Sequence, residues 1–173
     1  MSYKIITRLV RLAILTAFQV LVVNQVHIMG YITPLILGYM LICFHRGSSR
    51  IGILLWGFAI GFIFDIFSNT AGMASAACTL VAMVQQPLLE KFVSHDAAED
   101  VTPSIRTLSF GSYISYVFIL NLILHAVFYA LDAFTFHNWQ LTLIAIGGGT
   151  VISTIVTIFI EFLVRTRKSG SRE

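Results

Sequence analysis

The stretch that decides the fold runs from Ile51 to Glu90 and reads IGILLWGFAIGFIFDIFSNTAGMASAACTLVAMVQQPLLE. It contains no lysine or arginine, and it is longer than the roughly 20 residues that one membrane-spanning helix needs. Polar and turn-forming residues interrupt it near its middle, from Asp65 to Gly72. The stretch therefore predicts two membrane-spanning helices joined by a tight turn.

Two further stretches without lysine or arginine lie on either side of the first one, at 12–45 and 107–164. Each is also broken near its middle by polar or turn-forming residues, so each predicts a helical hairpin. The chain is thus expected to be a single all-α integral membrane domain over residues 1–173. It would be a six-helix transmembrane bundle with helices at about 9–26, 31–45, 51–67, 70–87, 109–131 and 140–164, and a cytoplasmic loop at 88–108.

The basic residues indicate the orientation. The 11 lysines and arginines fall in clusters between the hydrophobic stretches, so an even number of predicted crossings separates each cluster from the next. Lysine and arginine in short loops mark the cytoplasmic face of a membrane. Both termini are therefore expected to be cytoplasmic. The first apolar run is longer than the core of a signal peptide, and we expect it to be retained as the first helix.

The composition excludes several classes of protein. Hydrophobic residues make up 57% of the chain and charged residues 11%, whereas a soluble domain is about 25% charged. A soluble enzyme, a disordered tail and a nucleic-acid-binding module are therefore not expected. Cys43 and Cys78 lie in predicted helices without metal-ligand spacing, and the histidines are scattered, so no metal site, cofactor or catalytic residue is predicted.

The most specific local pattern consists of Gly57, Gly61 and Asp65, followed by Gly72 at the turn. A spacing of four places the first three on one helix face, where glycines let another backbone approach closely. Asp65 has two interpretations. It forms an outward-facing site or a contact with another subunit, or it caps the hairpin by accepting hydrogen bonds from backbone amides at the start of the next helix.

A second polar stripe follows the predicted helix at 109–131. Asn121, His125, Tyr129 and Asp132 recur at spacings near three and four. Of these, Asn121, His125 and Asp132 are candidates for a polar cavity or a proton path. The favoured alternative is that Asn121 and His125 form hydrogen bonds between helices. In the last helix, glycines 147–149 are interpreted as a site of tight packing in preference to a substrate-binding break.

These features together resemble one known family. The basic N-terminus, the six short hydrophobic helices and the residues Gly57, Gly61, Asp65 and Gly72 resemble the bacterial rod shape-determining protein family MreD. The resemblance implies a non-catalytic scaffold of the cell-elongation complex in the bacterial cytoplasmic (inner) membrane. Such a protein binds the single-span protein MreC and works with MreB, RodA and a transpeptidase to direct peptidoglycan synthesis and maintain cell shape.

A second architecture is similar and leaves an alternative. MreD proteins resemble the substrate-binding S-components of energy-coupling-factor transporters, and Ala13 and Ala17 resemble the alanine motif by which S-components contact their energising subunit. The alternative function is therefore a substrate-binding membrane component of a vitamin-type transporter, with an outward-open cavity around Asp65, His125 and Asp132. In both cases the expected surroundings include membrane lipid and no nucleic acid.

Overall fold

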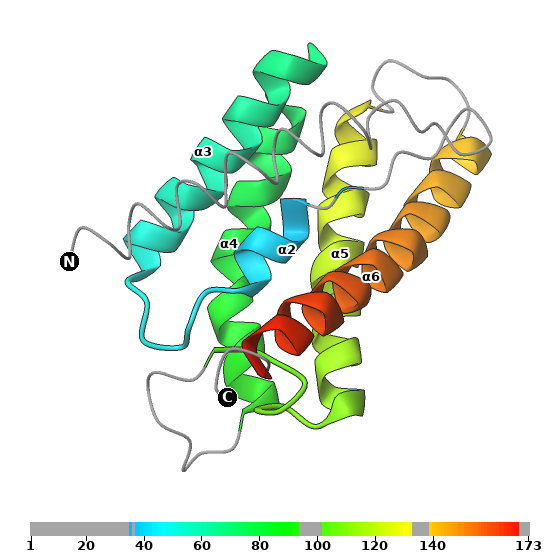
Figure 1. Cartoon of the computed structure of the whole chain (residues 1–173). Coiled ribbons are helices and arrows are strands. Elements are labelled where there is room, and N and C mark those ends of the chain that lie inside the picture. The colour runs from blue at the N-terminus through cyan, green and yellow to red at the C-terminus, as the bar shows by residue number, and fades with distance from the viewer. Residues whose placement is uncertain (1–34, 36, 94–101, 133–138, 170–173) are drawn as a thin grey trace.

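The computed structural model describes residues 35, 37–93, 102–132 and 139–169. These residues form the helices α2 (Leu37–Ile42), α3 (Arg50–Ser68), α4 (Met73–Phe92), α5 (Phe110–Asp132) and α6 (Trp139–Ser169), with no strand among them. Helices α3 to α6 run alternately up and down (Figure 1), α4 packs between α3 and α5, and α6 packs on α5. The prediction of an all-α protein is confirmed.

Within the part of the chain that the structure describes, three helices are long and apolar enough to cross a membrane, namely α3, α5 and residues 139–163 of α6. The 19 residues of α3 extend over about 28 Å, which matches the ~30 Å hydrocarbon core of a bilayer. Large apolar side chains are exposed along α3 and α6, including Phe62 and Phe159. A face of this kind is suited to lipid, and these helices are those of a membrane protein.

The predicted count of six helices is not supported, because the described residues contain five. The predicted helices at 51–67 and 109–131 correspond to α3 and α5 with a difference of one residue at each end. The predicted helix at 140–164 corresponds to α6, which begins one residue earlier and continues five residues further, to Ser169. The predicted first helix at 9–26, including Ala13 and Ala17, lies outside the described residues. The orientation of the termini stays a prediction.

The predicted helix at 31–45 is wrong in the part that the structure describes, because α2 has only six residues. It spans about 9 Å and cannot cross a membrane alone. The carbonyl groups that follow it are bonded to α4 instead: Gln85 Nε2 donates to Phe44 O at 3.3 Å, and Gln86 Nε2 donates to Arg46 O at 3.2 Å. These side-chain amides hold the non-helical segment that follows α2 against α4.

Helix α4 continues beyond the predicted end at residue 87, and residues 88–92 of the predicted loop belong to it. Proline inside a helix removes one backbone hydrogen bond, but Pro87 is exposed on the helix surface. The following turn is held by packing, since Leu89 is fully buried and the Phe92 ring lies edge-on to Tyr116 at 6.1 Å. This packing offsets the lost hydrogen bond.

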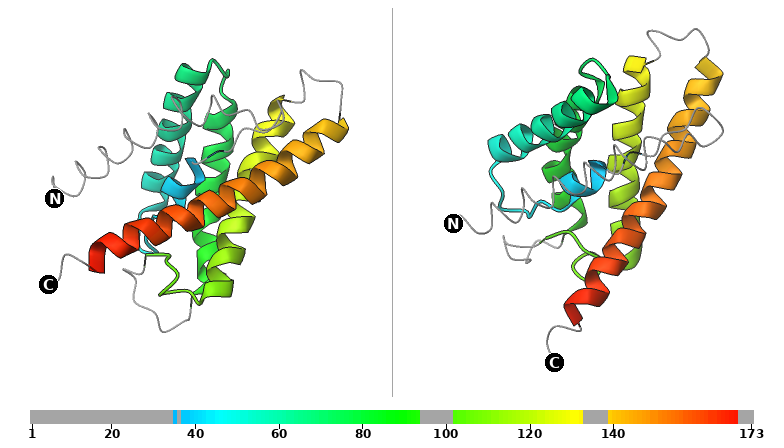
Figure 2. Two further views of the ribbon diagram at one scale, coloured as in Figure 1. Left: turned by 45° about the vertical axis from the view of Figure 1, so that its right-hand side comes forward. Right: turned by 45° about the horizontal axis from the view of Figure 1, so that its top comes forward.

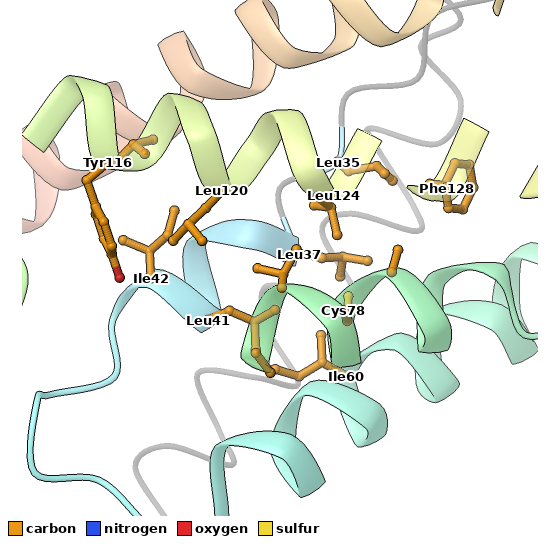
Figure 3. Close-up of a cluster of buried hydrophobic side chains, with 14 of the residues drawn as sticks. Leu35, Leu37, Leu41, Ile42, Ile60, Cys78, Tyr116, Leu120, Leu124 and Phe128 are labelled. Atoms are coloured by element: carbon orange, nitrogen blue, oxygen red, sulfur yellow. The ribbon is translucent and has the colours of Figure 1, made fainter. Parts of the chain in front are cut away.

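Helix α2 fills the centre of the bundle. Its side chains Leu37, Leu41 and Ile42 lie among residues of three longer helices (Figure 3), and each is at most 2% exposed. Helix α6 crosses the rest of the bundle obliquely (Figure 2), with α5 between it and the α3–α4 pair. The hydrophobic core therefore lies between α2, α3, α4 and α5, while the outer sides of α3 and α6 are exposed.

Candidate functional site

The turn between α3 and α4 is built from two residues with positive φ. Asn69 ends α3 in the left-handed conformation (φ 54°, ψ 37°), and Gly72 precedes α4 at φ 80°. The Thr70 amide donates to Asp65 O at 3.1 Å, which is the long hydrogen bond of a Schellman motif. Gly72, the predicted turn residue, therefore has a positive φ that residues with a side chain rarely adopt.

The Asp65 carboxylate joins the two helices across this turn. Oδ1 accepts hydrogen bonds from the Thr70 hydroxyl at 2.6 Å and the Ala74 amide at 3.0 Å. Oδ2 accepts hydrogen bonds from the Ser75 amide at 2.9 Å and the Ser75 hydroxyl at 2.5 Å. Gly72, at the N-cap position of α4, offers no side chain to cap the helix. Asp65 is therefore a remote N-cap, the second of the two interpretations given above.

The electrostatics of this cap are favourable. Asp65 is 6% exposed, and a buried carboxylate is tolerated only where partners replace water. Four donors do so, two of them backbone amides in the first turn of α4, where the positive end of the helix dipole lies. Each carboxylate oxygen of Asp65 therefore accepts two hydrogen bonds from donors within the chain.

Gly57 and Gly61 lie at the closest approach of α3 to α4. A Cβ atom at Gly61 would lie 2.4 Å from Ala74 O and 2.5 Å from Ser75 Cα, and one at Gly57 would lie 2.9 Å from Cys78 O. No side chain fits at such distances from backbone atoms. Both glycines are buried, so the predicted close approach is to α4 of the same chain, and neither position is open to a partner subunit.

The second candidate site is a buried hydrogen-bonded seam between α5 and α6. His125 Nδ1 lies 2.8 Å from the carbonyl oxygen of Asn121, and His125 Nε2 lies 3.2 Å from Ser153 Oγ. Ser153 Oγ also accepts a hydrogen bond from the Leu35 amide at 3.0 Å. A carbonyl can only accept, so Nδ1 donates to the carbonyl oxygen of Asn121. In the neutral tautomer with the proton on Nδ1, Nε2 accepts from the Ser153 hydroxyl. The seam thus anchors the chain just before α2.

Asn121 extends this seam by one turn. Its Nδ2 donates to Thr154 Oγ1 at 3.3 Å, and its Oδ1 lies where a Cβ atom at Gly38 would collide with it, at 2.6 Å. Both Asn121 and His125 are fully buried. Their contacts match the interpretation as hydrogen-bonding groups between helices.

The glycines at 147–149 do not break α6, which is continuous through them. Gly149 packs on the His125 ring, because a Cβ there would lie 2.5 Å from His125 Cδ2. Gly147 faces open space instead. Asp132 is the last residue of α5 and is half-buried. The hydrogen bonds of Asp65 go to α4 and those of His125 to α5 and α6, so the described contacts do not bring Asp65, His125 and Asp132 into one site.

Two functional side chains were missed from the sequence, Gln85 and Gln86. They hold the segment between α2 and α3, and Gln85 Nε2 also donates to the Tyr116 hydroxyl at 3.0 Å. The signal available was two consecutive amides in an otherwise apolar segment, since such groups need partners when buried. Cys43 and Cys78 are not joined by a disulfide, and the described residues hold no group of three metal-ligating side chains.

Comparisons with protein-family models, with curated proteins and with solved structures find no match for this chain. The class of this protein is therefore defined from its fold and its candidate site alone. It is an all-helical protein whose described residues include three helices suited to crossing a membrane. The buried carboxylate of Asp65 and the imidazole of His125 form hydrogen bonds to neighbouring helices.

Proposed function

We propose that this protein is a non-catalytic membrane scaffold of the bacterial cell-elongation complex, of the MreD type, in the cytoplasmic membrane. The observation that supports the proposal is that its buried polar side chains bond to neighbouring helices. Asp65, Asn121 and His125 all form hydrogen bonds that fix one helix against another. These hydrogen bonds between helices make the bundle rigid, and a subunit that positions other proteins needs a rigid structure.

The exposed faces of the framework supply the surfaces for partners. On α3, Phe58 and Phe62 are about half exposed and their rings stack at 5.8 Å. On α6, Ile155 and Phe159 are exposed to a similar or greater extent. Helices associate in membranes through van der Waals packing and a few hydrogen bonds. The single transmembrane helix of an MreC-like protein packs on one of these faces in the proposed complex, and MreB, RodA and a transpeptidase complete it.

Co-purification tests the proposal. The full chain is expressed with an MreC-like protein from the same bacterium and isolated in mild detergent. We expect the MreC-like protein to be retained, and we expect retention to fall for one of the pairs Phe58→Ala with Phe62→Ala or Ile155→Ala with Phe159→Ala. Both pairs replace exposed side chains, so each variant should keep the native thermal unfolding. A native chain that retains no MreC-like protein, in cells whose shape does not depend on it, would overturn the proposal.

The transporter alternative has a distinct outcome in the same preparation. It requires a small molecule that binds the purified chain saturably, together with retention of an ATPase module. The side chains on which it relies, Asp65 and His125, already have partners within the chain. Saturable binding of a vitamin-like ligand would favour this alternative over the scaffold.

A further inference from the structure

Two positively charged side chains, Arg50 on α3 and Lys91 on α4, lie at the same end of the bundle. Arg50 begins α3, about two turns before Gly57, and Lys91 lies about two and a half turns after Ala82 on α4. Gly57 packs directly on Ala82, with a hypothetical Cβ at 2.8 Å from the Ala82 Cβ. Because α3 and α4 are antiparallel, this register places Arg50 and Lys91 at a similar height at the same end.

The backbone beside these two cations is held in place from α4. Gln86 donates to the carbonyl oxygens of Arg46 and Ser48, just before the start of α3. The Ser49 side chain caps the Gly52 amide at 3.2 Å. The segment leading to Arg50 is therefore fixed by hydrogen bonds at both its ends.

The charge at this end is poorly balanced within the described chain. Arg50 and Lys91 are both exposed, and the first turn of α3 contains no acidic residue. The positive end of the α3 dipole adds to the charge of Arg50. Glu90, beside Lys91, is the one acidic side chain on these two helix ends, and it is also exposed. A third exposed cation, Arg106, lies on the linker that joins α4 to α5.

An exposed apolar stripe begins near each of these cations. The stripe on α3 begins at Ile51, directly after Arg50, and the stripe on α4 begins at Pro87, four positions before Lys91. Within each stripe successive exposed residues are three or four positions apart. The stripe on α3 consists of Ile51, Leu55, Phe58, Phe62 and Ile66, and that on α4 of Pro87, Met83, Leu80 and Ala76. A ligand that matches both features has an anionic head and apolar tails.

We propose that Arg50 and Lys91 form a binding site for an anionic phospholipid, with its headgroup at these cations and its acyl chains along the stripes of α3 and α4. A zwitterionic lipid fits less well, because its own cationic group neutralises the phosphate. Near a membrane surface each lysine or arginine contributes a factor of about five in affinity for anionic lipid. Removing both charges should therefore weaken binding by roughly 25-fold.

The test uses the full chain in neutral detergent and titrates it with phosphatidylglycerol, with phosphatidylcholine and with inorganic phosphate. Binding is followed by native mass spectrometry, which counts retained lipids, and by thermal unfolding. We expect phosphatidylglycerol to be retained and to raise the unfolding temperature more than phosphatidylcholine does. The Arg50→Gln and Lys91→Gln double variant should lose this preference, the charge-conserving Arg50→Lys and Lys91→Arg variant should keep it, and Glu90→Gln should strengthen it.

Salt provides a measurement on the unmodified protein. Because the cations are exposed, raising the salt concentration should weaken phosphatidylglycerol binding to the native chain and leave phosphatidylcholine unaffected. Equal retention of the two lipids by the native chain would overturn the proposal, as would a Gln double variant that keeps the full preference. Stabilisation by inorganic phosphate equal to that by phosphatidylglycerol would also overturn it, because the site would then recognise a free anion.

Discussion

The contact of α3 with α4 makes a quantitative prediction for Gly61→Ala. The added Cβ would lie 2.4 Å from Ala74 O, 2.5 Å from Ser75 Cα and 2.6 Å from Ala74 C. All three are backbone atoms in the turn that Asp65 caps, so relief requires α3 and α4 to move apart and strains the cap. Overpacking a well-packed contact costs about 1–3 kcal/mol, and we expect a value at the upper end.

Substitutions at two further glycines provide comparisons for Gly61→Ala. At Gly57 the nearest atoms to an added Cβ are the Ala82 Cβ at 2.8 Å and Cys78 O at 2.9 Å, so Gly57→Ala should cost less. At Gly147, within α6, an added Cβ meets nothing within 4 Å. Gly147→Ala should leave the unfolding temperature unchanged or raise it, since alanine favours a helix by up to about 1 kcal/mol over glycine.

Cys78 provides the assay. It is fully buried on α4, where its carbonyl group contacts Gly57. In a Cys43→Ser background it is the one remaining cysteine of the chain, so a thiol-reactive dye reports its exposure on heating. For a chain of this size 1 kcal/mol corresponds to about 2–4 °C, so Gly61→Ala should lower the midpoint by roughly 6–12 °C. If Gly61→Ala and Gly147→Ala unfold at the same temperature, the described α3–α4 contact is wrong.

Three further predictions concern the polar groups. Asp65→Asn should lower the unfolding midpoint, because it replaces an acceptor of four hydrogen bonds with an amide, and loss of an N-cap alone costs about 1 kcal/mol. Ser153→Ala and His125→Leu should each destabilise the chain, but their effects should not add in a double-mutant cycle, because the two side chains share one hydrogen bond. Gln86→Leu should speed proteolysis of the segment before Arg50, since that segment loses the two hydrogen bonds that Gln86 donates to it.

Each of these predictions has a control. Asp132→Asn, at the half-buried end of α5, should change stability less than Asp65→Asn, and an equal loss would contradict the capping role. Strict additivity of Ser153→Ala and His125→Leu would mean that the seam does not act as a unit. Met83→Leu, at an exposed position on α4, should leave proteolysis unchanged, and an unchanged rate for Gln86→Leu as well would refute the proposed anchoring.

The long apolar helices could be predicted from the sequence, because the free energy of apolar side chains in lipid determines them over many residues at once. The predicted range 51–67 differs from α3 by one residue at each end. The extent of α2 could not be predicted in this way. The segment after it is bound by Gln85 and Gln86 at the carbonyl groups of Phe44 and Arg46, and these contacts depend on how α4 packs, some 40 residues later in the chain.

The polar residues of the candidate site could be predicted from the sequence, but their hydrogen-bond partners could not. The sequence placed Asp65 at a hairpin and left two roles open. Its bonds to Ala74 and Ser75, nine and ten residues later, arise only because Asn69 and Gly72 turn the chain with positive φ. Similarly, the spacing of Asn121 and His125 indicated a polar stripe. Their partners lie on α6, 28 to 33 residues away, and only the packing register reveals them.

Photo-crosslinking in living cells tests the central claim most directly. A photoreactive amino acid is placed at Phe62 on α3, at Phe159 on α6 and, as a buried control, at Phe64. The scaffold proposal predicts a crosslink to an MreC-like protein from one of the two exposed positions and none from Phe64. Crosslinks from neither exposed position, in cells that keep their shape when this protein is depleted, would contradict it.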